Sequence, residues 1–356
     1  MKLYFPPSHY NAAYRGMVFP LLKPFIKSES FTDTERKEIY GVSEQDFTFT
    51  EFLEEADIVI LPMAWNYYVK TKQENLAVSF IKECGQLNKK VLALNIGDFG
   101  VKVPSFNNVI LLRSGGYKTK FENHEFCIPP FIEDPLKKYF SSDKIFLRPY
   151  QKFAVVGFCG QANASRVNAI KEVVKTSLRN LKYYFKLTKE EPQQILSTSY
   201  LRASVLNVLQ EADGVVCNFI FRKKYRAGVT SNKDFHETTL AFYNNLKDSD
   251  YIVCVRGAGN FSVRFYEALA MGRIPIFINT DCALPLDSMV AWKKHVVWVE
   301  FKDRFQVAEK VKQFHDSMTE VDFLALQQAN RSLWEDRLRL GGFCKGLIKS
   351  DLCIYK

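Results

Sequence analysis

The residues best suited to chemistry are an arginine and a glutamate three positions apart, Arg264 and Glu267, near the start of a predicted helix. Residues at this spacing share one helix face. The preceding loop contains Gly257 and Gly259, whose lack of a Cβ lets backbone amides approach an anion closely. An arginine there suits a diphosphate, and a carboxylate suits two vicinal hydroxyl groups. The pair therefore predicts a nucleotide site, with a solvated surface ion pair as the alternative.

The elements that must position this pair form one strand–loop–helix–strand unit. Residues 251–255 and 274–278 are β-branched and aromatic runs of the kind that buried parallel strands contain. Ser262 is a candidate N-cap of the helix between them, and Gly272 is a helix stop signal. We expect Arg256, in the loop, and Ser262 to assist at the phosphates.

A second segment of this kind lies earlier in the chain. Residues 153–158 are predicted as a strand, and Gly157, Gly160 and Arg166 are predicted to form a loop before a helix that begins near Val167. A glycine loop at a helix N-terminus suits a phosphate group. Two such loops, each beside an arginine, indicate an anion site more strongly than either loop alone.

The first half of the chain offers two candidates for a general base. Strands and helices alternate over residues 1–140, which predicts a parallel sheet covered by helices. Ligands of such sheets lie beyond the carboxyl ends of the strands. His9 follows the first strand, and Asp98 follows a later one within N-I-G-D-F-G. For each residue the alternative is a turn-forming or capping role, and spacing does not decide between them.

Composition limits the class of protein. The chain has 356 residues, 47% of them hydrophobic, which is enough for two domains with separate cores. It has no apolar run of about 18 residues and no signal-peptide pattern, so we expect a cytoplasmic protein. Its eight cysteines lack C-x-x-C spacing, which indicates buried thiols in a reducing compartment, with neither a zinc site nor disulfides.

The net charge of +10 favours anionic partners. Nucleotide sugars, a lipid-linked acceptor or a membrane surface would each fit. Nucleic acid is a poorer fit, because the one dense basic cluster, R-K-K-Y-R at 222–226, has no recognition motif around it.

Residues 262–277, S-V-R-F-Y-E-A-L-A-M-G-R-I-P-I-F, resemble the most recognisable block of the exostosin-like glycosyltransferases, S-x-R-F-x-E-A-L-x-x-G-C-I-P-V-I. The matching positions are Ser262, Arg264, Glu267, Gly272 and Pro275. Arg273 replaces the usual cysteine of the family. Three other segments are also similar to the family: residues 281–292, residues 56–62 and the G-x-x-x-x-x-R stretch from Gly160 to Arg166. The resemblance is strongest over residues 240–300.

The resemblance implies an α/β protein of the GT-B-like class, in which two Rossmann-like domains face each other across a cleft. Prolines between residues 129 and 149 mark a boundary. We therefore expect an acceptor-side domain at 1–145, a nucleotide-sugar-binding domain at 146–325, and a helical segment at 326–356 that returns to the first domain. The implied activity is inverting transfer of a hexosyl or glycuronosyl group to a saccharide or glycolipid acceptor, in polysaccharide synthesis.

The resemblance also implies roles for particular residues. Arg166 and Arg264 would hold the pyrophosphate and Glu267 would bind the ribose. Asp98 lies where exostosins carry a D-W-G-like element and would be the catalytic base, with His9 as its competitor. The expected donor-binding set is Gly160, Arg166, Arg256, Gly257, Gly259, Asn260, Ser262, Arg264 and Glu267.

We expect no metal and no other cofactor. Asp248 and Asp250 form a D-x-D sequence, but they precede the strand at 251–255 and so should lie at its end opposite the glycine loop. Two alternatives stay open. One is a retaining enzyme, which Asn260 disfavours because retaining GT-B enzymes often carry a glutamate seven residues before the ribose glutamate. The other is a non-catalytic partner subunit that binds nucleotide sugars. Peripheral association with the inner membrane is a further option.

Overall fold

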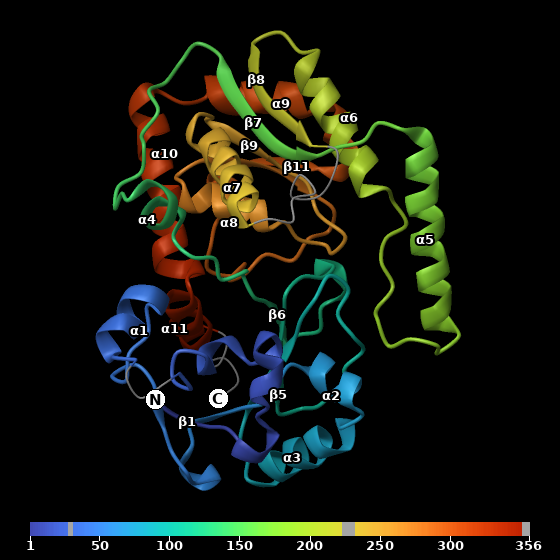
Figure 1. Ribbon diagram of the computed structural model, residues 1–356, viewed down its shortest axis with the longest axis vertical. Coiled ribbons are helices and arrows are strands. Elements are labelled where there is room, and N and C mark those ends of the chain that lie inside the picture. Colours follow the sequence, from blue (N-terminus) through green and yellow to red (C-terminus); the bar gives the residue numbers. More distant parts are fainter. Residues whose placement is uncertain (28–30, 223–231, 351–356) are drawn as a thin grey trace.

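The computed structural model describes residues 1–27, 31–222 and 232–350 (Figure 1). They build two β-sheets, one from each half of the chain, and the described strand pairs within both sheets are parallel. Helices flank both sheets (Figure 1). The predicted class, α/β with two Rossmann-like domains, is confirmed.

The first sheet has the strand order β2-β1-β3-β4-β5-β6. Its central strands are apolar runs, and every residue of β4 and β5 is buried, as expected for strands covered on both faces. The strands are β1 (Lys2–Tyr4), β2 (Thr48–Phe49), β3 (Ile58–Ile60), β4 (Val91–Asn95), β5 (Val109–Arg113) and β6 (Glu125–Cys127). The helices of this half are α1 (Asp33–Tyr40), α2 (Trp65–Thr71), α3 (Glu74–Gln86) and α4 (Pro135–Phe140).

The second sheet has the order β11-β10-β9-β7-β8, with β8 at one edge. Its strands are β7 (Ala154–Gln161), β8 (Val215–Arg222), β9 (Tyr251–Cys254), β10 (Ile274–Asn279) and β11 (Val297–Glu300). The helices are α5 (Arg166–Tyr184), α6 (Thr198–Gln210), α7 (Asn232–Lys247), α8 (Val263–Ala270), α9 (Val307–Asp316) and α10 (Glu320–Leu333). The predicted strand–loop–helix–strand unit is confirmed as β9, α8 and β10.

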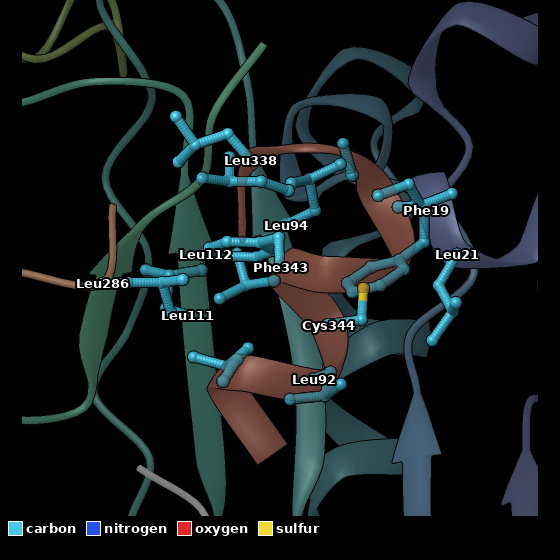
Figure 2. Close-up of a cluster of buried hydrophobic side chains, with 14 of the residues drawn as sticks. Phe19, Leu21, Leu92, Leu94, Leu111, Leu112, Leu286, Leu338, Phe343 and Cys344 are labelled. Atoms are coloured by element: carbon cyan, nitrogen blue, oxygen red, sulfur yellow. The ribbon is translucent and has the colours of Figure 1, made fainter. Parts of the chain in front are cut away.

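The chain ends with α11 (Leu340–Ser350), which packs on the first sheet. Figure 2 shows Phe343 of this helix beside Leu94 and Leu112, and the Phe343 ring lies 6.0 Å from that of Phe131. The first core therefore contains C-terminal side chains as well as N-terminal ones. The domain boundaries expected at 145/146 and 325/326 remain proposals, and the second of them falls inside α10.

Between α1 and β3, Thr48–Phe49 form β2 and Leu53–Glu55 form one 3₁₀ turn. Helix α5 continues to Tyr184. Gly341 and Gly342 lie in α11. There the backbone of Gly41 comes so close that a Cβ on Gly341 would lie 1.9 Å from the Gly41 oxygen.

Candidate functional site

A cavity of about 750 Å³ lies at the carboxyl ends of β7, β8 and β9, within the size range of small-molecule sites. The Asp98 loop of the first domain closes one side of it. Five of the predicted donor-binding residues line it: Gly160, Gly257, Ser262, Arg264 and Glu267. The two halves of the chain therefore contribute to one site.

Arg264 lies in the first turn of α8, which begins directly after Ser262. Its Nη2 donates a hydrogen bond to the Cys159 carbonyl oxygen over 2.9 Å, and its guanidinium stacks over the Phe158 ring at 4.5 Å. Burial lowers its pKa. Its buried Nε has no hydrogen-bond partner among the described residues. Arg264 is therefore a desolvated cation with donor capacity left at the cavity wall.

Gly160 makes room for this arginine. A Cβ added at Gly160 would lie 2.7 Å from Arg264 Nη2, which is closer than carbon and nitrogen atoms pack. The predicted phosphate loop at 157–166 is wrong, because β7 continues to Gln161 and pairs with β8 along its whole length. Arg166 begins α5, where its side chain is exposed and is not among the described residues that line the cavity.

Two further arginines, outside the predicted donor-binding set, line the cavity. Arg202, on α6, donates from Nη2 to the Arg256 carbonyl oxygen over 3.2 Å. Burial and, to a smaller extent, the nearby positive charge of Arg264 together lower its pKa to about 10. Arg222, at the end of β8, donates to the Thr238 carbonyl oxygen over 2.6 Å. In the sequence, Arg202 could have been recognised as a charged residue within the apolar pattern of α6.

The sequence contains one dense basic cluster, at residues 222–226. Arg222 belongs to β8, and the remaining residues of the cluster lie outside the described part of the chain.

Glu267 lies one turn after Arg264 on the same face of α8, as its spacing predicts. The Tyr243 hydroxyl donates to Glu267 Oε1 over 3.2 Å. Burial raises the pKa of Tyr243, and the charge of Glu267 raises it further. The Tyr243 ring stacks on that of Tyr139, with centroids 4.5 Å apart. The cavity wall thus combines a carboxylate with a pair of aromatic rings.

The two candidate bases have different surroundings. Asp98 is exposed and lines the cavity. Its backbone meets Gly259, where an added Cβ would lie 2.5 Å from the Asp98 carbonyl oxygen. His9 is 6% exposed, packs against Phe80 and has its Nδ1 3.2 Å from the Tyr68 hydroxyl. Burial lowers its pKa, and it is not among the described residues that line the cavity. Asp98, unlike His9, therefore lies at the cavity, and its close contact with Gly259 joins the two domains.

Arg256 and Asn260 lie beneath the loop rather than in the cavity wall. Arg256 is buried and donates from Nη1 to the Tyr117 hydroxyl over 3.0 Å. The Asn260 amide donates to the carbonyl oxygens of Gly116 and Thr280 over 2.9 and 3.1 Å. Because Gly116 and Tyr117 follow β5 of the first sheet, these two side chains fasten the donor loop to the first domain.

The D-x-D sequence lies at the other end of β9. Asp250 is 1% exposed, and its Oδ1 accepts from Arg148 Nε over 2.5 Å while its Oδ2 accepts from the Val155 amide over 2.9 Å. These bonds account for its burial. Within the described ranges, no group of three His, Cys, Asp or Glu side chains is arranged to hold a metal ion. No helix in the described part of the chain is long and apolar enough to cross a membrane.

Fold and site together define a two-domain α/β protein with an arginine-rich cavity at the carboxyl ends of its second sheet. Residues 142–314 match the family model of the exostosin GT47 domain. The match confirms the resemblance seen in the sequence.

Two other similarities have limited extent. Exostosin-1 of Drosophila melanogaster is 32% identical over 90 residues, which are 25% of this chain and 11% of that protein. A solved structure of S. aureus TarM, in complex with fondaparinux, α-GlcNAc-glycerol and UDP, shares 10% sequence identity at a TM-score of 0.29. That alignment covers 75% of this chain and 50% of TarM. The chain thus spans only a small part of the curated relative.

Proposed function

We propose that the chain is a glycosyltransferase that moves a hexosyl or glycuronosyl group from a nucleotide sugar to a saccharide or glycolipid acceptor, with inversion and without a metal. The observation that carries this proposal is the cavity in which Arg202, Arg222 and Arg264 meet Glu267 and Asp98. We further propose a cytoplasmic role in polysaccharide synthesis.

The three guanidinium groups are the proposed partners of the donor's diphosphate. Burial lowers the pKa values of Arg202 and Arg264, and each buried cation carries a desolvation penalty that a bound anion would offset. During transfer, negative charge develops on the departing diphosphate. Arginines held in place before the reaction stabilise such charge without reorganisation. In this proposal their charges replace those of a metal ion.

Glu267 is the proposed partner of the ribose. Its carboxylate can accept hydrogen bonds from two vicinal hydroxyl groups, and it lies one helical turn from the diphosphate partner Arg264. Tyr243 already orients one of its oxygens, with 3.2 Å between the hydroxyl and Oε1. The donor's nucleoside and diphosphate would therefore lie along α8.

Asp98 is the proposed general base. In a single displacement the acceptor hydroxyl oxygen bonds to the anomeric carbon, the bond from that carbon to the diphosphate oxygen breaks, and the hydroxyl proton passes to the carboxylate. Asp98 is exposed at the cavity, whereas His9 is enclosed by Tyr68 and Phe80. Asn260, where retaining enzymes often carry a glutamate, is 1% exposed and bonded to backbone carbonyls. Both facts support inversion with Asp98 as the base.

A thermal-shift panel of nucleoside diphosphates and nucleotide sugars, run with and without a chelator, tests the proposal. A ligand at about 100 times its Kd should add roughly 2.7 kcal/mol to the free energy of unfolding. A chelator should leave the shift unchanged. If no nucleoside diphosphate or sugar nucleotide raises the Tm, the proposal fails.

Product analysis separates the two alternatives from the proposal. NMR of the anomeric configuration should show inversion, and a retained configuration would identify a retaining enzyme. Tight donor binding without transfer to any acceptor, and without donor hydrolysis, would instead favour a non-catalytic partner subunit.

A further inference from the structure

Helix α5 has the opposite polarity from an ordinary surface helix. It stands at the margin of the second domain, away from the main body of the sheet (Figure 1). Several of its inward residues are polar. Glu172 accepts hydrogen bonds from the hydroxyls of Ser197 and Ser199, and Asn180 exchanges hydrogen bonds with the Gln193 backbone. A surface helix normally turns its apolar stripe toward the core, but here the stripe faces outward.

The outward stripe is continuous along the helix. Its residues recur at intervals of three or four positions, so they lie on one face. Each is 49–72% exposed: Val167, Ile170, Val174, Leu178, Leu181 and Phe185. Tyr184 and Leu187 extend the apolar surface at the tip, where they are 68% and 75% exposed. We call these eight residues the α5 stripe. An apolar surface of this length on a soluble domain indicates a binding surface.

Positive charge runs beside the α5 stripe. Lys171, Lys175, Lys182 and Lys186 are all exposed, and each directly follows a residue of the stripe. The one acidic residue of α5, Glu172, faces inward to Ser197 and Ser199 and so does not neutralise them. The exposed face of the helix is therefore apolar and basic.

This charge distribution selects among the partners that could cover the stripe. A second copy of α5 would bring lysines toward lysines, with no exposed acidic side chain on either helix to pair with them. An anionic lipid surface would bind both parts, since acyl chains accept the apolar stripe and headgroups attract the lysines. We propose that α5 docks on an anionic membrane surface, lying in its plane. The lysines and the polar inward face are incompatible with a spanning helix.

The inward side of α5 contacts the loop that holds the candidate base. On this side, the Arg179 guanidinium lies 3.5 Å from the centroid of the Phe99 ring. Phe99 directly follows Asp98 in the chain. The helix that carries the stripe thus also contacts the Asp98 loop. The inference goes beyond the proposed function, and membrane binding can be measured without any glycosyl transfer.

Vesicle flotation with the full chain tests the proposal. We expect flotation with phosphatidylcholine vesicles that contain roughly 30 mol% phosphatidylglycerol at about 0.1 M salt, and much weaker flotation with phosphatidylcholine alone. Since a lysine near such a surface contributes about 1 kcal/mol, the triple variant K171Q/K175Q/K182Q should lose roughly a hundredfold in the partition coefficient. L178E should lose more than about tenfold, because it places a charge in the apolar contact.

The matched control is K312Q/V321E, which changes an exposed lysine on α9 and a 75% exposed valine on α10. It should float like the unchanged protein. All variants should keep the unchanged protein's Tm and nucleotide-induced thermal shift, because the substituted side chains are exposed. Absence of flotation, equal flotation with neutral vesicles, or equal flotation of the stripe variants and the control would each overturn the proposal. A dimer that L178E dissociates, without flotation, would assign the stripe to a second copy instead.

Discussion

Replacing Arg264 by glutamine should weaken donor binding strongly while leaving the folded protein almost as stable. The side chain donates hydrogen bonds to the carbonyl oxygens of Cys159 and Val253, over 2.9 and 3.4 Å. Glutamine can replace one of them, so the loss is about 1 kcal/mol of hydrogen bonding. Burial lowers the pKa of Arg264, which means that the empty site carries a desolvation cost for this charge. Neutralising the side chain offsets the lost hydrogen bond.

The loss of donor affinity is not compensated in this way. A charge-assisted hydrogen bond to phosphate contributes about 1.5–3 kcal/mol, which corresponds to roughly a 10- to 150-fold increase in Kd. The matched control is Arg166→Gln, which removes an exposed arginine from the start of α5. This control should bind the donor like the unchanged protein, because Arg166 is not among the described residues that line the cavity.

Isothermal titration calorimetry is the appropriate assay, with the nucleoside diphosphate that gives the largest thermal shift, alongside melting curves of both variants. Two results would refute the reasoning. One is an unchanged Kd for Arg264→Gln. The other is an equal loss of affinity in Arg166→Gln, which would restore the arginine pair predicted from the sequence.

Three further predictions concern the first domain and its contact with the donor loop. Asp98→Asn should lower kcat by about 10²- to 10⁴-fold and leave the donor-induced thermal shift unchanged. His9→Gln should retain transfer in the same steady-state assay. The reverse pattern of the two kcat values would make His9 the base. Gly259→Ala, whose Cβ would lie 2.5 Å from the Asp98 oxygen, should cost about 1–3 kcal/mol in a denaturant titration. Gly16→Ala, with no atom within 4 Å, should change little, and equal effects would show that the domain contact adapts. Burial lowers the pKa of His9, so the unfolded chain binds its proton first and the free energy of unfolding should fall as the pH drops below about 6.5. His9→Gln should make this decline shallower in urea titrations at several pH values, and an unchanged slope would rule out His9 as its source.

The parts of the site set by local sequence could be predicted. The period of α8, its start after Ser262 and the glycine that follows it are properties of adjacent residues, and the face shared by Arg264 and Glu267 follows from helix geometry alone. The buried strands β9 and β10 were equally predictable, because continuous β-branched runs bounded by polar residues and glycines have few other stable conformations.

The parts set by pairing between distant residues could not be predicted. Gly160 remains in a strand because it pairs with Phe221, and its lack of a side chain matters because Arg264 crosses it. Arg256 had the signature of a phosphate ligand, yet its guanidinium bonds the Tyr117 hydroxyl in the other domain. Arg202 lies on a separate helix and reaches the cavity only through the packing of α6 on the sheet. No local pattern contains this information.

Donor binding and transfer depend differently on the contact between the domains. The guanidinium groups and Glu267 are positioned by the second sheet and its helices, whereas Asp98 follows β4 of the first sheet. Only the contact between domains fixes the distance from the base to the donor. Asn260 bonds Gly116 across this contact, and the absence of a side chain at Gly259 allows the Asp98 loop to approach. Changes in this contact should therefore reduce kcat more than donor affinity, while changes at Arg264 should reduce both.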